Sequence, residues 1–260
     1  MIWRAFTVSL GTAMRRVLAQ PASLMFTVGF YLAVTSVVSS LWRTAADASG
    51  GLVVGYTAVA LTWYIATSEA VTIALNQRVI EETGEAIASG AVAVELLRPV
   101  SVLLVRVAME IGHTLPRLAT CILVGLAYAQ TFAGEAPNLV ALALAVPSMV
   151  LAVTCNLLAQ HAFAAVSFWI RDSRSTWFLY QKLVFIAGGM LLPLEVLPDG
   201  MEAVTRVLPF MAMAYAPARL ASGHVEPMLL LVQIAWLVVL GGLAVAAFSK
   251  GEARLRVVGG

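Results

Sequence analysis

Four ionisable side chains recur at helical spacing in one otherwise apolar part of the chain. Separations of four, three and four residues place them on one face of a helix: Arg106, Glu110, His113 and Arg117. Glu69, the only charge in an earlier apolar run, can pair with Arg106 or Arg117, because ionised groups inside membranes usually find partners. Two interpretations stay open for this polar face. It is the amphipathic entry to a membrane helix, with charges that neutralise one another, or it lines the inner mouth of a transport pathway.

A second polar set lies in a later apolar run. Asn156, Gln160 and Ser167 share one helical face, and His161 lies beside it. Such faces on membrane helices form hydrogen bonds between helices more often than they contact substrate. The set therefore predicts either helix packing or the lining of a pathway.

The motifs of several catalytic classes are missing. Glu110 and His113 have the Glu-x-x-His spacing of di-iron helix bundles, but no second such motif accompanies them. No phosphate-binding G-x-x-x-x-G-K-[ST] loop is present, and Cys121 and Cys155 both lie in apolar runs. We therefore expect a non-catalytic chain with no metal, nucleotide or other cofactor of its own.

The composition indicates an integral membrane protein. The chain is 61% hydrophobic and only 12% charged, with a mean hydropathy of +0.91. Soluble domains carry about 25% charged residues. The net charge of +2 gives no reason to expect nucleic-acid binding, so the expected environment is the lipid bilayer.

The hydropathy pattern predicts a single all-α transmembrane domain over residues 1–260 with six transmembrane helices. Residues 1–20 combine an apolar face with arginines and an early Trp, which is typical of an interfacial helix. Each of the following runs is expected to span the membrane: 22–42, 52–75, 102–133, 139–170, 176–192 and 228–248.

Prolines interrupt the chain between the fifth and sixth runs. Residues 193–227 contain Pro193, Pro198 and Pro209, which lie too close together for a spanning helix. Short helices that dip into the outer half of the membrane are expected here, packed against protein or facing a watery cavity.

Residues 78–101 form the one long polar interruption of the chain. Placing both termini in the cytoplasm puts most arginines and lysines inside and leaves Arg43, Arg206 and Arg219 outside. The 78–101 stretch is then cytoplasmic, with Val94 and Leu97 on one face of a short helix. It is either a solvated loop or a segment that docks on a soluble partner.

Two sets of residues resemble a known family. Residues 90–101, GAVAVELLRPVS, resemble the pattern after the second helix of type 2 ABC exporter permeases, although Arg98 stands where many members have a small or polar residue. The second set resembles a bacterial subgroup of these permeases: FWIRDSR from Phe168, GGMLLPLEVLP from Gly188, LPF from Leu208 and YAPAR from Tyr215.

This resemblance implies a permease subunit in the bacterial inner membrane, with both termini cytoplasmic. ATP and Mg²⁺ would bind cytoplasmic ABC ATPase subunits, and a second permease half, identical or related, would complete the pathway. The implied coupling helix would dock on the ATPase through Glu85, Gly90, Val94, Glu95, Leu97 and Arg98. Re-entrant helices would close the outer gate near Pro193, Glu195, Pro198, Pro209 and Tyr215.

Two rival functions are weighed. An ion-coupled secondary transporter would need an internal repeat with matching broken helices, and the sequence has no such self-similarity. A membrane-embedded enzyme acting on lipid would use His113 or His161 as base, but no second catalytic group follows at a suitable spacing. Lipid, glycan, peptide and drug substrates are all compatible with an exporter of this sequence.

Overall fold

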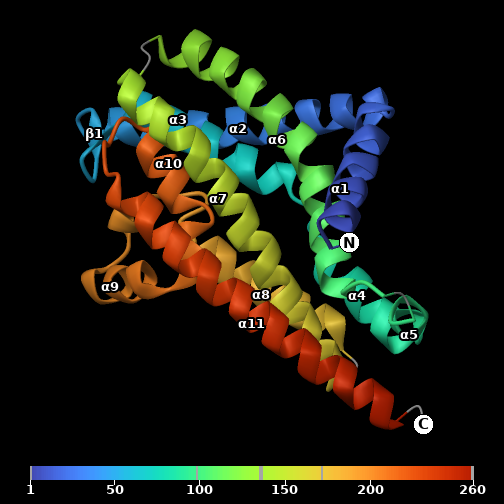
Figure 1. Cartoon of the computed structure of the whole chain (residues 1–260). Helices are drawn as coiled ribbons and strands as arrows, with labels where there is room; N and C mark the ends of the chain where they lie inside the picture. Colours follow the sequence, from blue (N-terminus) through green and yellow to red (C-terminus); the bar gives the residue numbers. More distant parts are fainter. Residues whose placement is uncertain (1, 98, 135–136, 171, 259–260) are drawn as a thin grey trace.

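The computed structural model describes residues 2–97, 99–134, 137–170 and 172–258. Long helices dominate this part of the chain (Figure 1). They are α1 (Ile2–Leu18), α2 (Pro21–Ala48), α3 (Ala58–Ala74), α6 (Val102–Ala133), α7 (Leu139–Ala164) and α11 (Met228–Val258). Shorter elements are α4 (Val79–Ala88), α5 (Ala91–Glu95), η1 (Ala165–Phe168), α8 (Ser173–Ala187), η2 (Leu194–Val196), α9 (Asp199–Val207), η3 (Pro209–Ala212) and α10 (Tyr215–Ala221).

Among the described residues, five helical segments are long and apolar enough to cross a membrane. They are Pro21–Ala48, Ala58–Ala88, Val102–Ala133, Leu139–Phe168 and Met228–Leu255. The protein is therefore an all-α membrane protein. The run expected as a further span, 176–192, contains most of α8, whose 15 residues are shorter than the roughly 20 that a bilayer crossing needs.

Side-chain caps fix where several helices begin. Ser101 accepts a hydrogen bond from the Leu104 amide at the start of α6, and Asn138 does the same for the Val140 amide at α7. Such caps satisfy amides that have no partner within the helix. At the other end of α6, Gly134 takes the left-handed conformation (φ +75°) that commonly ends a helix.

The start of the expected second span, 52–75, is not helical. Leu52–Val53 (β1) and Tyr56–Thr57 (β2) form a two-stranded antiparallel hairpin in which Leu52 pairs with Thr57. Gly51 and Gly55 have positive φ angles there, a conformation that costs glycine little. The helix begins only at Ala58, after Thr57 caps it. The expectation of one continuous helix from residue 52 was therefore wrong.

Helix boundaries elsewhere also differ from the expected ranges. Helix α11 continues beyond residue 248 to Val258, so the basic residues after the apolar run are helical. The polar stretch 78–101, expected to hold one short helix, contains two, α4 and α5. Residues 193–227 contain η2, α9, η3 and α10, none longer than the 9 residues of α9.

The segment Ala58–Ala88, which begins with α3, is the most enclosed of the candidate spans, with 72% of its most apolar window buried. Its side chains bind the backbone of the non-helical segment that follows α8. The Tyr64 hydroxyl donates to the Gly189 carbonyl, and Ser68 Oγ donates to the Met190 carbonyl at 2.8 Å. Trp42 of α2 donates to the Leu191 carbonyl at 2.8 Å. Carbonyls left free by the end of α8 are thus satisfied inside the protein.

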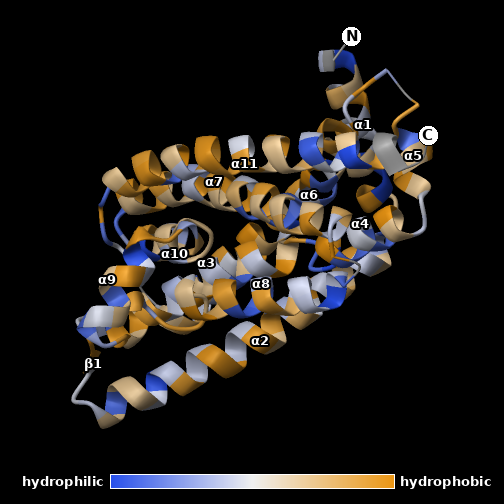
Figure 2. Ribbon diagram, turned by 90° about the horizontal axis from the view of Figure 1, so that it is seen from below, coloured by the Kyte–Doolittle hydropathy of each residue, from blue (hydrophilic) through white to orange (hydrophobic). Residues whose placement is uncertain are grey.

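The elements separate into two ends of the molecule. In both views α1, α4, α5 and the end of α11 lie at one end, and the hairpin, α9 and α10 lie at the other (Figures 1 and 2). Hydrophobic residues run along the lengths of α2 and α11 between the two ends (Figure 2). Both described chain ends therefore lie at the same end as α4 and α5.

Helix α1 lies directly on α6 where α6 has a glycine. A Cβ atom placed on Gly112 would lie 2.4 Å from the Leu10 backbone oxygen and 2.8 Å from the Ala13 Cβ. Real Cβ atoms do not approach other atoms so closely, so the absence of a side chain at Gly112 sets the distance between the helices.

Gly112→Ala should lower the free energy of unfolding by about 1–3 kcal/mol, because α1 must shift to make room. Thermal unfolding of the purified full chain in detergent measures this. The matched control is Gly242→Ala on α11, where a Cβ would meet no atom within 4 Å. The control should be neutral or gain up to about 1 kcal/mol from helix propensity. Equal stability of Gly112→Ala and wild type would contradict the close packing.

Candidate functional site

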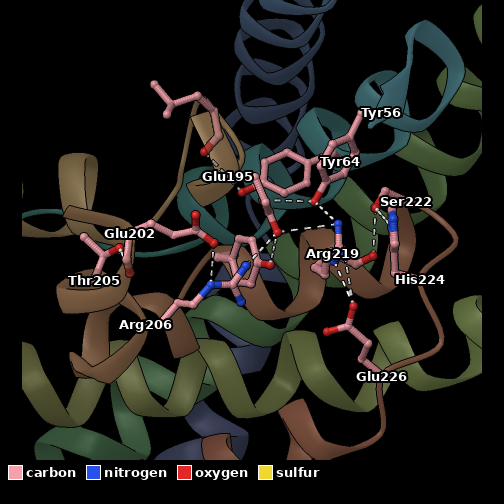
Figure 3. Close-up of polar contacts among 12 residues, drawn as sticks. Tyr56, Tyr64, Glu195, Glu202, Thr205, Arg206, Arg219, Ser222, His224 and Glu226 are labelled. Carbon is pink, nitrogen blue, oxygen red and sulfur yellow. Dashed lines mark hydrogen bonds and ion pairs between the residues drawn. The ribbon is translucent and has the colours of Figure 1, made fainter. Parts of the chain in front are cut away.

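Glu195 is the centre of a polar cluster at the end that holds the hairpin, α9 and α10 (Figure 3). Its Oε1 atom accepts hydrogen bonds from Arg206 at 2.9 Å and from the Tyr215 hydroxyl. Arg219 Nη1 lies 3.5 Å from the same oxygen, and the Tyr56 hydroxyl donates to Oε2 at 3.3 Å. One carboxylate thus binds side chains from β2, α9 and α10.

Each arginine of this cluster also binds a second carboxylate. Arg206 donates to Glu202 at 2.7 Å, and Arg219 binds Glu226 at 3.0 Å (Figure 3). Arg219 also donates to the Tyr56 hydroxyl and lies over the Tyr56 ring, 5.2 Å from its centroid. We call Tyr56, Glu195, Arg206, Tyr215, Arg219 and Glu226 the outer cluster.

The charge states of the outer cluster follow from its contacts. Burial raises the pKa of Glu195, but the Tyr215 hydrogen bond and the two arginines outweigh burial and hold it below its usual range. Burial and the Glu195 carboxylate raise the pKa of Tyr215. Glu195 is therefore ionised at neutral pH, and Tyr215 keeps the proton that it donates.

At the opposite end, an ion pair fastens α5 to α6. Arg106 binds both carboxylate oxygens of Glu95, with Nη2–Oε1 at 2.9 Å and Nε–Oε2 at 3.1 Å. Arg106 also donates to Thr83 of α4 at 3.2 Å. This forked geometry is specific to arginine and fixes the direction of both partners. Glu95, which was expected to contact a partner ATPase, is therefore engaged within this chain.

Apolar side chains project from the same segment. Val94 is 65% exposed and Leu97 is 84% exposed, whereas Val92 is fully buried. Glu85 and Gly90 are also exposed, and Arg98 lies outside the described residues. We call residues 85–97 the tip. Four residues predicted to dock on the ATPase are exposed on it: Glu85, Gly90, Val94 and Leu97.

The four ionisable residues of α6 form no ion pair with one another. Arg106 forms its ion pair with Glu95. Oε1 of Glu110 lies 3.5 Å from the side-chain amide nitrogen of Asn76. Glu69 forms no ion pair with Arg106, Arg117 or any other described residue. His113 is half-buried on the same helix. The predicted pairing of Glu69 with Arg106 or Arg117 is therefore wrong for this part of the chain.

The polar side chains of α6 and Glu69 line two different cavities. One of about 310 Å³ lies beneath α4 and α5 and is lined by Arg106, Glu110 and His161, among others. The other, of about 600 Å³, is lined by residues that include Glu69, Arg117 and Asn156. The residues predicted to form one inner-mouth face therefore line two different cavities. Arg106 and Glu110 line the cavity beneath α4 and α5, and Glu69 and Arg117 line the larger one.

The sequence pattern of the ABC-2 family transporter proteins matches residues 32–259, nearly the whole chain. The chain belongs to the ABC-2 family. It is a permease subunit of an ABC transporter, a multi-pass membrane protein of a class that associates with an ABC ATPase. No curated protein sequence matches it well enough to be reported as a relative.

The ABC-2 protein uses its second polar set partly for packing. Gln160 donates to Asn156 at 2.8 Å, and the Tyr180 hydroxyl of α8 donates to Asn156 at 2.9 Å. Ser167 lies apart from them, near Gly84 of α4, and its buried Oγ has no partner among the described residues. Asn156, Gln160 and Ser167 therefore do not form one continuous polar surface.

Histidines and cysteines give no sign of a metal centre. Within the described ranges no three side chains of His, Cys, Asp or Glu are grouped to hold an ion. His161 binds the Leu157 carbonyl at 2.7 Å through Nδ1, and both cysteines are free and buried.

The predicted outer-gate residues have two kinds of role in this ABC-2 protein. Glu195 and Tyr215 meet in the outer cluster. Pro193, Pro198 and Pro209 instead lie at the starts of η2, α9 and η3, where a missing amide hydrogen costs nothing.

Sequence reasoning missed four members of the outer cluster: Tyr56, Arg206, Arg219 and Glu226. Their partners lie as far as 163 residues away, so no local spacing connects them. The available signal was that Arg206 and Arg219 were among the few basic residues expected on the outer side.

Glu195→Gln should destabilise the ABC-2 protein at pH 7 by about 1–3 kcal/mol, because two arginines lose their shared carboxylate. A lowered pKa means that the stabilisation is present above the usual Glu value, about 4.3, and disappears as the pH falls through the folded-state pKa. Thermal unfolding of wild type and variant should therefore differ at pH 7 and converge only below the folded-state pKa of Glu195, which lies under the usual Glu value.

The control is Glu202→Gln, which removes one contact of Arg206 and leaves Glu195 in place. Its effect should be smaller than that of Glu195→Gln. Equal melting temperatures for wild type and Glu195→Gln at pH 7 would rule out a stabilising outer cluster.

Proposed function

We propose that this ABC-2 protein is the membrane half of an exporter driven by a separate cytoplasmic ATPase. ATP and Mg²⁺ bind that partner, and this chain carries no cofactor and binds no nucleic acid. The observation that carries the proposal is the exposed apolar tip, where Val94 projects from α5 and Leu97 from the turn after it, in a segment that also exposes charged Glu85. Water does not favour such a surface, and a groove on a partner covers it.

Movement of the tip would reach the membrane helices through α6. The Glu95–Arg106 ion pair joins α5 to the first turns of α6, a helix of 32 residues with Pro116 inside it. An α-helix of that length is about 48 Å long, and an internal proline favours a kink. ATPase closure would therefore displace α6 and, through it, the helices that pack on it.

The pathway would form between two such chains, identical or related. We place α8 and the segment after it as the sixth membrane-associated element, with η2, α9, η3 and α10 as re-entrant helices. The outer cluster would hold these helices together as the outer gate.

The proposed orientation places both termini in the cytoplasm of a bacterial cell, with the chain in the inner membrane. Both described chain ends lie at the same end as α4 and α5 (Figure 1). Arg4, Arg15, Arg16 and Arg78 belong to that end, in keeping with the excess of positive charge on the cytoplasmic side of membrane proteins.

Leu97→Asp tests the docking surface. A charge forced into an apolar groove costs a few kcal/mol, so affinity for the ATPase should fall at least about 30-fold. The tagged full chain is purified from its source membranes in mild detergent, and the ATP hydrolysis that it retains is measured.

The matched control is Ala253→Asp, an exposed position on α11 at the same end of the molecule. It should retain the ATPase. Because Leu97 is 84% exposed, both variants should melt at the wild-type temperature. A Leu97→Asp protein that keeps its ATPase activity would remove the tip from the docking role.

Labelling of single cysteines tests the orientation. Cysteines at Ser49 and Ala203 should react with a membrane-impermeant thiol reagent in cells whose inner membrane is intact. Cysteines at Ser89 and Ala253 should react only after lysis. All four positions are exposed, and the native Cys121 and Cys155 are buried and give little background. The opposite labelling pattern would invert the topology.

A further inference from the structure

A groove of about 600 Å³ runs along α2, α3 and α8. Helix α2 lies along one edge of the molecule (Figure 2). The groove follows it from Ser23 to Val38, a length of about 22 Å at 1.5 Å per residue. Phe26 and Phe30 of its lining are 76% and 52% exposed, so the groove opens sideways from the protein. It has the shape of a site for a long, narrow ligand that enters from the bilayer.

Helix α2 lines the groove with polar Ser23 and Thr27 alternating with Phe26 and Phe30 at one end, and with only Val34 and Val38 further along. Ser23, Thr27 and Gln77 belong to the end where α2 begins. Val34, Val38 and Leu191 belong to the end near Trp42, which binds the Leu191 carbonyl. A ligand that matches this gradient has a polar head and an apolar chain.

Glu69 is the residue of the groove that indicates most clearly which charge a ligand carries. It comes from α3, is only 2% exposed, and forms no hydrogen bond or ion pair with a described residue. Polar side chains that line the same groove do not hydrogen-bond to Glu69, since Asn156 and Tyr180 bind each other. A buried carboxylate without a partner is costly, and a cationic group of a ligand would relieve that cost.

Arg117 supplies the opposite charge to the same groove. It comes from α6, its buried Nε atom has no hydrogen-bond partner, and it forms no ion pair with a described residue. A cation alone would leave Arg117 without a partner, and an anion alone would leave Glu69 without one. A single ligand that satisfies both side chains carries both charges.

We infer that this groove binds a zwitterionic amphiphile, with its amine at Glu69, its phosphate or carboxylate at Arg117, and its chain along α2 towards Val38. This inference rests on the proposed function, because it names the class of molecule that the exporter moves. Glu69 and Arg117 act as binding residues that select for charge.

Native mass spectrometry of the purified full chain tests binding without any ATPase. Three ligands of matched chain length are compared: monoacyl phosphatidylethanolamine with both charges, monoacyl phosphatidylglycerol with the negative charge, and an alkyltrimethylammonium with the positive charge. Wild type should bind the zwitterion at least about tenfold more tightly than either of the others.

Glu69→Gln should reduce zwitterion binding to the level of the anionic ligand, and Arg117→Gln should reduce it to the level of the cationic ligand. Val34→Trp, which fills the groove from α2, should weaken all three ligands. The matched controls are Glu252→Gln and Arg254→Gln on α11, outside the groove, and they should bind as wild type does. Melting temperatures verify that each variant is folded.

Equal binding of the three ligands by wild type would overturn the inference, as would unchanged zwitterion binding in Glu69→Gln or Arg117→Gln. A cation that binds as tightly as the zwitterion would also overturn it. In the assembled transporter, ATP should lower the occupancy of the zwitterion. Occupancy that ATP leaves unchanged would mark a structural lipid and overturn the substrate role, whatever the result for Leu97→Asp.

Discussion

The end of the molecule that holds the hairpin, α9 and α10 depends on how the backbone after α8 obtains its hydrogen bonds. The helix stops at Ala187, and the carbonyls that follow lie in buried or partly buried surroundings. Tyr64 and Ser68 of α3 bind two of these carbonyls, and Trp42 of α2 binds a third. In an apolar medium each unsatisfied group costs several kcal/mol, so these three side chains make the broken segment possible. The short helices that carry the outer cluster are then held against α3 rather than left in lipid.

The two ends of the molecule are stabilised by the same kind of contact, an arginine that binds a carboxylate from another element. Arg106 joins α5 to α6 at one end, while Arg206 and Arg219 converge on Glu195 at the other. These pairs are partly buried, so breaking one leaves a charge without compensation. Between the ends, packing relies on small residues such as Gly112, which let helices approach closely. The charged contacts therefore determine which elements meet, and the apolar contacts determine how near they come.

Sequence reasoning predicted the elements whose signals are local. The expected run 102–133 coincides with α6, because Ser101 and Gly134 mark its ends with a cap and a left-handed turn. Residues 52–57 were misjudged because Leu52 and Val53 suit an apolar helix as well as a short strand, although Gly51 and Gly55 signalled a turn. Of the outer cluster, only Glu195 and Tyr215 were anticipated, and those from a family resemblance. Contacts such as Arg219 with Tyr56 depend on tertiary structure and leave no periodic pattern in the sequence.

The long separation between partners has a consequence for how the chain is made. Tyr64 binds Gly189, which is 125 residues later, and Ser68 binds Met190, which is 122 residues later. At a synthesis rate of about 5–20 residues per second, α3 leaves the ribosome about ten seconds before these partners exist. During that interval the Tyr64 and Ser68 hydroxyls lack these distant carbonyl partners. The packing of α3 against the segment after α8 is therefore completed only once that segment has been made, which makes it a late step of folding.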